Sequence, residues 1–319
     1  MRKTLLAVLA AGLSAAISAA QNPGMHGEDR KPDRIDLASP EVAVPMHVEK
    51  GRPIVDVTVN GKGPFPFVLD TGAGGTVLGG DLVQELGLPT IGEVQIGDPI
   101  HPHGLAAKQV KIESVAIGGL TLTNMTATSV ENSGFREHLG ARGVLGIPLF
   151  SDLLLTIDYA GGQVRIARGE LPDSDGKEIL ALRPAAHGLI RVPITVGALE
   201  VDADVDSGSP AAVSLPEEYM EKLPLEAKPV QIGKARTVTA EFPVYGATLK
   251  GAVQIGRHRL ENPSLRFNKL PNANIGGEVL GGFAITIDQK NRRIRFVEKG
   301  SGPAAAAGAA ANPSGSAIR

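Results

Sequence analysis

The chain alternates between short apolar, β-branched runs and polar turns rich in glycine and proline. Apolar and polar residues alternate over 54–59, 110–117 and 120–128. A period of two predicts strands that bury one face, and the turns between them set their ends. Only 80–88 and 216–223 favour short helices. The pattern therefore predicts an all-β protein with a few short helices.

The same order of runs and turns occurs twice along the chain. In the first half, a strand run reaches Asp70, then come a helical stretch, two alternating runs and a closing segment that ends at Gly146. In the second half the same features run from Asp206 to Gly281. The two spacings are 76 and 75 residues. Glycine-rich turns could recur by chance, but the shared order of four features favours a duplication with two lobes about a pseudo-two-fold axis.

The two ends of the chain differ in composition from the part between them. Residues 1–20 have a basic start, a short apolar stretch and small residues at their end, which is typical of a signal peptide. Residues 21–44 are polar and rich in proline and glycine, so they predict a linker or a short pro-segment. Residues 299–319 are of low complexity and predict a disordered tail. The two lobes are then expected at 45–170 and 171–298.

The leader predicts an exported protein, periplasmic or secreted, with no membrane span in the mature chain. A single anchoring helix is the alternative, but the apolar stretch is short for a bilayer.

Composition narrows the chemistry that the chain can perform. The 319 residues include 32 Lys and Arg and 34 Asp and Glu, so a net charge of -2 gives no electrostatic case for nucleic acid. Cysteine is absent, which excludes disulfides, thiolate metal sites and a cysteine nucleophile. The candidate chemistry therefore rests on carboxylates and hydroxyls.

Two short segments share one pattern, in which a β-prone run ends in Asp and is followed by a small hydroxyl residue and Gly. An Asp at such a position lies at a tight turn, and two turns facing each other would place two carboxylates in one site. Like charges that close cannot both ionise, so the pair would share a proton, one carboxylate acting as base and the other as acid. The residues are Asp70, Thr71 and Gly72 in the first segment and Asp206, Ser207, Gly208 and Ser209 in the second.

Both segments resemble the active-site motifs of aspartic peptidases, the first more like the retropepsin form and the second more like the pepsin form. In that family an apolar-apolar-Gly triplet packs beside each catalytic turn. The resemblance covers roughly 45–298 and implies a pepsin-like or retropepsin-like fold, with two homologous barrel-like β-lobes and a cleft between them. The matching triplets here are Val144, Leu145 and Gly146, and Val279, Leu280 and Gly281.

The resemblance implies that Asp70 and Asp206 form a catalytic dyad around a water molecule. One Asp would take the proton of the water while the other protonates or polarises the scissile carbonyl. Thr71 and Ser207 would reach across to the opposite backbone, and the motif glycines would let the turns approach. No cofactor, metal or covalent intermediate is implied. The partner would be a peptide or protein substrate in an extended conformation, and the chain would be a monomer because it holds both half-sites.

Asp204 departs from the family pattern, which has an apolar residue at this place. It lies two residues before Asp206, so on a strand the two share a face. Three interpretations follow from the sequence. Asp204 is solvated or salt-bridged; or it is buried and raises the pKa values of the dyad; or its carboxylate contributes to a cation site.

The hairpin that covers the substrate is a second departure, because pepsin-like enzymes carry a Tyr on it. The first candidate, 97–108, contains His101 and His103 and no Tyr, whereas the second, 233–250, contains Tyr245. The two histidines predict a solvated loop tip, a substrate contact, or a metal pair that lacks an evident third ligand. A slow or fastidious enzyme is expected.

The sequence thus predicts an aspartic endopeptidase. One alternative is a non-catalytic protein that binds peptides or other ligands on the same bilobal fold. A second is a two-carboxylate glycosidase, against which stand the absence of Trp and an aromatic content of 3%.

Overall fold

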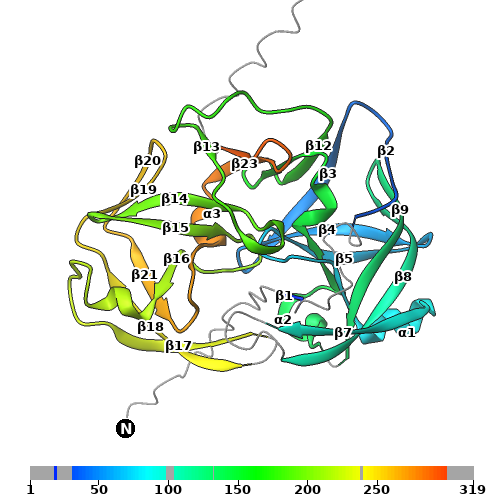
Figure 1. Cartoon of the computed structure of the whole chain (residues 1–319), viewed down its shortest axis with the longest axis horizontal. Helices are drawn as coiled ribbons and strands as arrows, with labels where there is room; N and C mark the ends of the chain where they lie inside the picture. The colour runs from blue at the N-terminus through cyan, green and yellow to red at the C-terminus, as the bar shows by residue number, and fades with distance from the viewer. Residues whose placement is uncertain (1–17, 20–30, 98–103, 132, 238–239, 300–319) are drawn as a thin grey trace, which may run out of the picture.

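The computed structural model describes residues 18–19, 31–97, 104–131, 133–237 and 240–299 (Figure 1). Within them the chain forms two sheets and only short helices, so the prediction of an all-β fold is confirmed. The helices are α1 (Gly80–Leu86), α2 (Phe135–Leu139) and α3 (Gly277–Leu280), with 3-10 turns η2 (Ile147–Phe150), η3 (Ala186–Gly188) and η4 (Glu217–Met220).

The larger sheet is built mainly from the first half of the chain. Its strands are β1 (Ser18–Ala19), β2 (Arg34–Leu37), β3 (Glu41–Glu49), β4 (Arg52–Val59), β5 (Lys62–Asp70), β6 (Val77–Gly79), β7 (Thr90–Gly97), β8 (Leu105–Ile117), β9 (Leu120–Val130), β10 (Gly143–Gly146), β11 (Leu154–Asp158), β12 (Gln163–Ala167), β13 (Ile179–Ala181), β23 (Phe283–Asp288) and β24 (Arg293–Glu298).

The smaller sheet comes entirely from the second half of the chain. Its strands are β14 (Arg191–Val196), β15 (Leu199–Val205), β16 (Val213–Pro216), β17 (Val230–Arg236), β18 (Glu241–Thr248), β19 (Ala252–Ile255), β20 (His258–Glu261), β21 (Ser264–Asn268) and β22 (Ala273–Ile275).

The two halves pair their strands in the same order around each Asp-containing turn. Strand β5 runs parallel to β10, which is antiparallel to β6, and β6 runs parallel to β9. Strand β15 likewise runs parallel to β22, which is antiparallel to β16, and β16 runs parallel to β21. The strands that lead into Asp70 and Asp206 therefore have equivalent neighbours.

A hairpin from each half joins the halves across one shared region of the larger sheet. Strand β11 pairs antiparallel with β23, so that Thr156 lies opposite Thr286 and their hydroxyl oxygens are 2.9 Å apart. Strands β23 and β24 thus return from the second half to complete the sheet of the first (Figure 1). This pairing fixes how the two Asp-containing turns face each other.

The first half begins earlier than the sequence predicts. Residues 34–44, which the composition predicts to be part of a linker or short pro-segment, contain β2 and the start of β3. Along β3, Val42, Val44 and Met46 are buried while their neighbours are exposed, so an alternating strand was hidden by polar composition. The predicted signal peptide, apart from the two residues of β1, and nearly all of the predicted tail lie outside the described residues.

The main core cluster is largely aliphatic, with a few Phe, and runs through both halves. Leu145 and Leu155 from the first half belong to the same cluster as Val205, Ile275 and Ile285 from the second. Burial of side chains on this scale is the main force that holds the halves together. In the part of the chain that the structure describes, no helix is long and apolar enough to cross a membrane.

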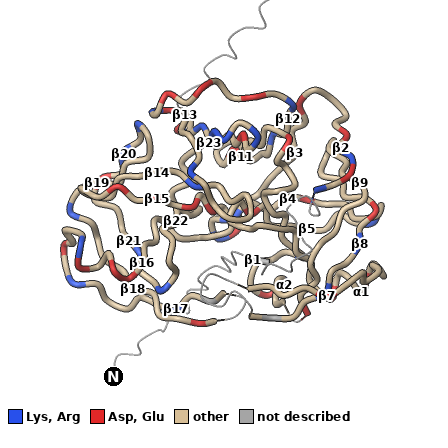
Figure 2. Tube along the Cα trace, in the orientation of Figure 1, with Lys and Arg blue, Asp and Glu red and all other residues tan. Residues whose placement is uncertain are grey.

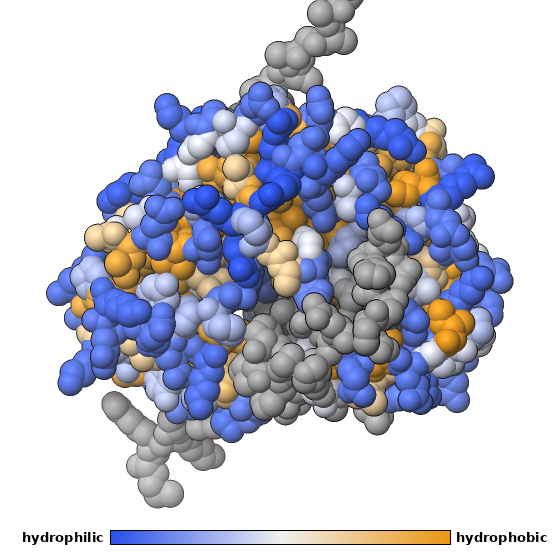
Figure 3. Space-filling model, in the orientation of Figure 1, coloured by the Kyte–Doolittle hydropathy of each residue, from blue (hydrophilic) through white to orange (hydrophobic). Residues whose placement is uncertain are grey.

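Lys and Arg are interspersed with Asp and Glu along the described chain (Figure 2). The described residues on the face in Figure 3 are mostly hydrophilic. Among the described residues, the exposed large hydrophobic side chains are Val48, Ile91, Val230 and Ile232.

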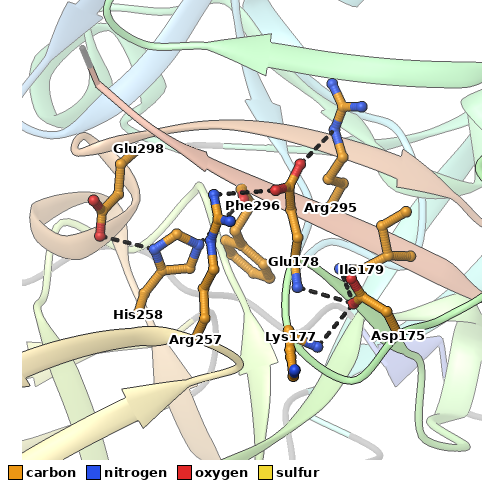
Figure 4. A network of polar contacts seen from close by, with 9 residues as sticks. All are labelled: Asp175, Lys177, Glu178, Ile179, Arg257, His258, Arg295, Phe296 and Glu298. Atoms are coloured by element: carbon orange, nitrogen blue, oxygen red, sulfur yellow. Dashed lines mark hydrogen bonds and ion pairs between the residues drawn. The ribbon is translucent and has the colours of Figure 1, made fainter. Parts of the chain in front are cut away.

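A polar network ties the β19–β20 hairpin to β24 (Figure 4). The buried ring of His258 contacts Glu298 Oε1 at 2.8 Å and the carbonyl oxygen of Phe296 at 3.2 Å. Beside it, Glu178 forms ion pairs with Arg257 at 3.0 Å and with Arg295 at 3.9 Å. These contacts connect the second sheet to the strand that returns to the first.

Candidate active site

Two buried carboxylates lie at the ends of equivalent strands. Asp70 is the last residue of β5 and Asp206 follows the last residue of β15, and their exposed fractions are 3% and 4%. Each begins a tight turn, since the backbone N–H of Ala73 donates to the carbonyl of Asp70 and that of Ser209 donates to the carbonyl of Asp206. Turns of this kind carry the carboxylates out of the sheets and toward one another.

Reciprocal hydrogen bonds between Thr71 and Ser207 lock the two turns together. The Thr71 hydroxyl donates to the carbonyl of Val205 at 2.6 Å and accepts from the Ser207 backbone N–H at 3.0 Å. The Ser207 hydroxyl donates to the carbonyl of Leu69 at 2.7 Å and accepts from the Thr71 backbone N–H at 3.0 Å. The contact across the halves that the resemblance implies for these two residues is present, and it is symmetric.

Gly72 and Gly208 are required for space rather than for an unusual backbone conformation. Neither has a positive φ. A Cβ on Gly72 would lie 2.5 Å from Cγ of Asp206, and a Cβ on Gly208 would overlap the carboxylate of Asp70. Each carboxylate therefore packs directly over the glycine of the opposite turn, which brings the two acids together.

This proximity perturbs the protonation of the pair. Burial raises the pKa of Asp70 well above its usual range, and the charge of Asp206 and a side-chain hydrogen bond between the two acids raise it further. The backbone N–H of Gly72 and the charge of Arg52 act in the opposite direction. The pair is thus arranged to hold one proton between two carboxylates at a pH where isolated carboxylates are fully ionised.

Arg52, which sequence reasoning missed, is a buried cation beside the pair. It begins β4 in the first half, is 2% exposed, and donates from Nε to the carbonyl of Gly208 in the second half at 2.7 Å. Burial lowers its pKa, while the charges of Asp70, Asp206 and Glu49 raise it. Its position at the start of an ordinary strand gave no sequence signal, because only the docking of the halves places it there.

The triplet beside Asp70 lies where the resemblance implies. Val144, Leu145 and Gly146 form β10, with Gly146 opposite Asp70. A Cβ on Gly146 would collide with the backbone of Gly75, so this strand passes directly over the loop that follows the turn.

The second triplet is not the equivalent of the first, and that prediction is wrong. Beside β15 lies β22, with Ile275 opposite Val205 and its carbonyl accepting from the Asp206 backbone N–H at 2.9 Å. Gly276 therefore stands to Asp206 as Gly146 stands to Asp70, and a Cβ there would collide with the backbone of Ala211. Val279, Leu280 and Gly281 instead belong to α3 and its C-terminal cap.

The physical reason for this error is one polar residue. Position 274 of β22 is Asn, where β10 has Val144, so the strand beside Asp206 lacks the apolar pattern. The apolar pair occurs one element later, where Val279 and Leu280 are buried in the core.

Asn274 contacts the candidate dyad directly, and sequence reasoning missed it. Its Nδ2 donates to Oδ2 of Asp206 at 2.7 Å, while the Ser209 backbone N–H donates to Oδ1 at 3.0 Å. Ser209 thus holds both the turn and the carboxylate.

Asp204 is neutralised by an ion pair. Arg191 lies opposite it on β14 and donates from Nε to Oδ1 at 2.7 Å and from Nη2 to Oδ2 at 3.0 Å. Hydrogen bonding to Asp204 raises the pKa of Arg191. A two-pronged contact of this kind supports the salt-bridged interpretation. Among the described residues, no group of three or more His, Cys, Asp or Glu side chains could hold a metal ion.

None of the three residues predicted on the covering hairpins is seen at a hairpin tip in the described part of the chain. His101 and His103 lie outside the described residues, between β7 and β8. Tyr245 lies in the middle of β18, opposite Gln231 and Phe267, and packs against the core. It is therefore remote from the turn between β17 and β18, where a covering Tyr would be expected.

A buried phenol, that of Tyr159, lies near the pair. Tyr159 follows β11, is 9% exposed, and its hydroxyl has no partner among the described residues. Burial is the main cause that raises the pKa of Tyr159, and the charges of Asp206 and Asp70 raise it further. The phenol therefore stays neutral. It adds no charge to the site.

A small hollow opens in the second half beside Ser209 and Asn274, two residues that contact Asp206. Its walls include Ser209, Ser214, Thr237, Phe242, Arg266 and Asn274. Arg266 also pairs with Glu278 at 3.4 Å. The hollow could receive a side chain of a molecule bound over the pair.

The geometry agrees with a comparison against known families. The family model for aspartyl proteases matches residues 55–149. This segment contains Asp70 and the first triplet, so the resemblance to aspartic peptidases is confirmed there. An aspartyl protease domain supports a hydrolase that acts on peptide bonds. The match ends before Asp206, whose role rests on the geometry above. None of the curated proteins compared with the chain matches it.

Proposed function

We propose that this protein is an aspartic endopeptidase whose catalytic dyad is Asp70 and Asp206. The observation that carries the proposal is the reciprocal lock between Thr71 and Ser207, because it places each carboxylate against the glycine of the opposite turn. Two mutually repelling buried carboxylates are costly for a protein that only binds a ligand. Hydrolysis of a peptide bond needs one acid and one base, which two carboxylates sharing a proton supply.

The dyad would act on a water molecule held between the carboxylates. The ionised carboxylate takes a proton from the water as its oxygen attacks the scissile carbonyl, and the protonated carboxylate donates to the carbonyl oxygen. The tetrahedral intermediate collapses when the carboxyl that took the proton of the water gives it to the leaving nitrogen. The other carboxylate recovers the proton that it had donated to the carbonyl oxygen, and the products are a carboxylic acid and an amine. This sequence consumes one water and leaves no group on the enzyme.

The remaining features of the proposal follow from the organisation of the chain. The substrate would be an extended segment of a peptide or protein, bound over the dyad. The matching strand order around the two turns supports an internal duplication, and the presence of both half-sites in one chain supports a monomer. The leader-like residues 1–20 support export to the periplasm or beyond.

Digestion of a random peptide library tests the activity. The reaction is run from about pH 3 to about pH 8, across the range where coupled carboxylates titrate, and read by mass spectrometry. We expect internal cuts that are suppressed by a hydroxyl-bearing mimic of the tetrahedral intermediate. Binding of peptides without any cut at any pH would favour the non-catalytic alternative.

Arg52 provides a prediction about pH dependence. The positive charge of Arg52 lowers the pKa of Asp70 and attracts the negative charge of Asp206. Arg52 therefore favours both the first and the second ionisation of the dyad, and Arg52→Gln removes this help. Both limbs of the pH–rate profile should therefore move to higher pH, by about one unit.

Arg257→Gln serves as the matched control, since Arg257 is half exposed in the distant network of Figure 4. A profile for Arg52→Gln that falls in height without moving would show that Arg52 has only a structural role.

A further inference from the structure

The two halves of the dyad differ at one equivalent position. On β10, Val144 lies opposite Val68; on β22, Asn274 lies opposite Asp204. The amide of Asn274 reaches Oδ2 of Asp206 at 2.7 Å. Valine offers no donor, so this contact has no counterpart in the first half.

The two carboxylates consequently have different sets of donors among the described residues. Asp206 accepts at both oxygens, from Asn274 Nδ2 and from the Ser209 backbone N–H. Asp70 accepts from the Gly72 backbone N–H at 2.8 Å and shares a hydrogen bond with the other acid. Donors that point at a carboxylate stabilise its ionised form, so the charge is favoured on Asp206.

We propose that Asn274 is a positioning residue that fixes the negative charge of the dyad on Asp206 and leaves the shared proton on Asp70. The inference rests on the proposed function. Under it, Asp206 is the base that takes the proton of the water, and Asp70 is the acid that donates to the scissile carbonyl.

The orientation of the Asn274 amide follows from its surroundings. An ionised carboxylate only accepts hydrogen bonds, so the NH₂ group must face Asp206. The amide oxygen Oδ1 is then buried without a partner among the described residues. Keeping this orientation at the expense of an unpaired oxygen indicates that the contact with the carboxylate is strong.

The other charged and titratable groups near the dyad do not supply the same bias. Arg52 attracts both Asp70 and Asp206, and its own charge is balanced in part by Glu49. The charge of Asp204 is compensated by Arg191. Tyr159 is buried and neutral. Among the contacts of the described residues named here, the one from Asn274 distinguishes one acid from the other.

Replacement of Asn274 by Leu tests this assignment through the pH profile of kcat/KM. The acidic limb reports ionisation of the base, and the basic limb reports loss of the proton from the acid. Asp206 is ionised both when the dyad carries one charge and when it carries two, so loss of the amide destabilises these two states equally. Only the first ionisation, from the fully protonated dyad, then becomes harder. The acidic limb should move up by about one pH unit, which is a tenfold loss of activity on that limb, while the basic limb stays.

Asn272→Ala is the matched control, because Asn272 lines the same hollow and, among the described residues, makes no hydrogen bond to either acid. It should leave both limbs in place. A uniform loss of kcat/KM in Asn274→Leu, with both limbs unmoved, would overturn the proposal and show a purely structural role.

Carboxyl carbon-13 NMR of the wild-type protein shows which acid carries the shared proton, and it needs no catalytic activity. With signals assigned from Asp70→Asn and Asp206→Asn, we expect the Asp206 carbon to have the shift of an ionised group while Asp70 has that of a protonated one. The reverse order would overturn the inference. If the wild type cuts no peptide, the proposed function fails, whereas this titration still decides where the proton lies.

Discussion

Replacement of Asp70 or Asp206 by Asn is expected to reduce peptide hydrolysis by about 10³-fold or more, since each variant removes one acid–base group from a dyad that needs both. The side chain keeps its shape and its contacts with the turn, so the loss reports chemistry. Both single variants should be affected to a similar extent because one proton is shared. The measurement is kcat/KM for a peptide chosen from the library digestion.

Asp202→Asn is the control for this experiment. Asp202 lies on the same strand, β15, but is half exposed and pairs with Arg183 at the surface. It should retain wild-type activity. Retention of more than about a tenth of the activity in Asp70→Asn would exclude the dyad mechanism.

Asp70→Asn, which is expected to lower activity, is expected to raise the stability of the fold at neutral pH. In the folded state the pKa of Asp70 is raised above its unfolded value, so between the two values the folded protein binds more protons than the unfolded chain. Stability then falls as the pH rises through this window, starting near the unfolded pKa of about 3.9. The Asn side chain does not ionise, so Asp70→Asn does not lose stability as the pH rises through this window. Its melting temperature should therefore exceed that of wild type at pH 7, and the difference should shrink toward pH 4. Equal differences at both pH values would contradict the assignment.

Loss of the Thr71 hydroxyl is expected to be the most damaging change in the lock between the halves. Thr71→Val keeps the shape but leaves the buried carbonyl of Val205 and the backbone N–H of Ser207 without partners. Each unsatisfied group costs about 1–3 kcal/mol, so the free energy of unfolding should fall by about 2–6 kcal/mol. That is a large part of the total of about 5–15 kcal/mol usual for a domain, and activity should fall with it because the dyad loses its alignment.

Two variants bracket this result. Thr71→Ser keeps the hydroxyl and copies the second half, where Ser207 makes the equivalent contacts, so most of the stability and activity should return. Thr195→Val removes a hydroxyl from an exposed position on β14 and should change stability by less than about 0.5 kcal/mol. Denaturant unfolding measures all three. A Thr71→Val protein as stable as wild type would show that the lock contributes little.

The alternation of apolar and polar residues was sufficient to predict most strands around the site, because strands that bury one face repeat with a period of two. The runs at 54–59, 110–117 and 120–128 became parts of β4, β8 and β9. Composition was a poorer guide, since it hid β2 and the start of β3 within a segment that looked like a linker.

The error at the second triplet has the same origin. An apolar pattern predicts a buried strand, but the strand beside Asp206 carries the polar Asn274, and only its parallel pairing with β15 identifies it. Pairing between segments about 70 residues apart leaves no local signal in the sequence, because it depends on which edges meet when the chain folds.

The sequence by itself determined the β class, the two Asp-containing turns and their hydroxyl and glycine neighbours, because these depend on local periodicity and turn chemistry. Only the tertiary structure decided that Gly72 and Gly208 are needed for space, that Arg191 neutralises Asp204, and that Arg52 and Asn274 reach the dyad. Each of those facts joins residues distant along the chain. Their energies arise from burial and from the approach of charges, which exist only once the two halves are packed against each other.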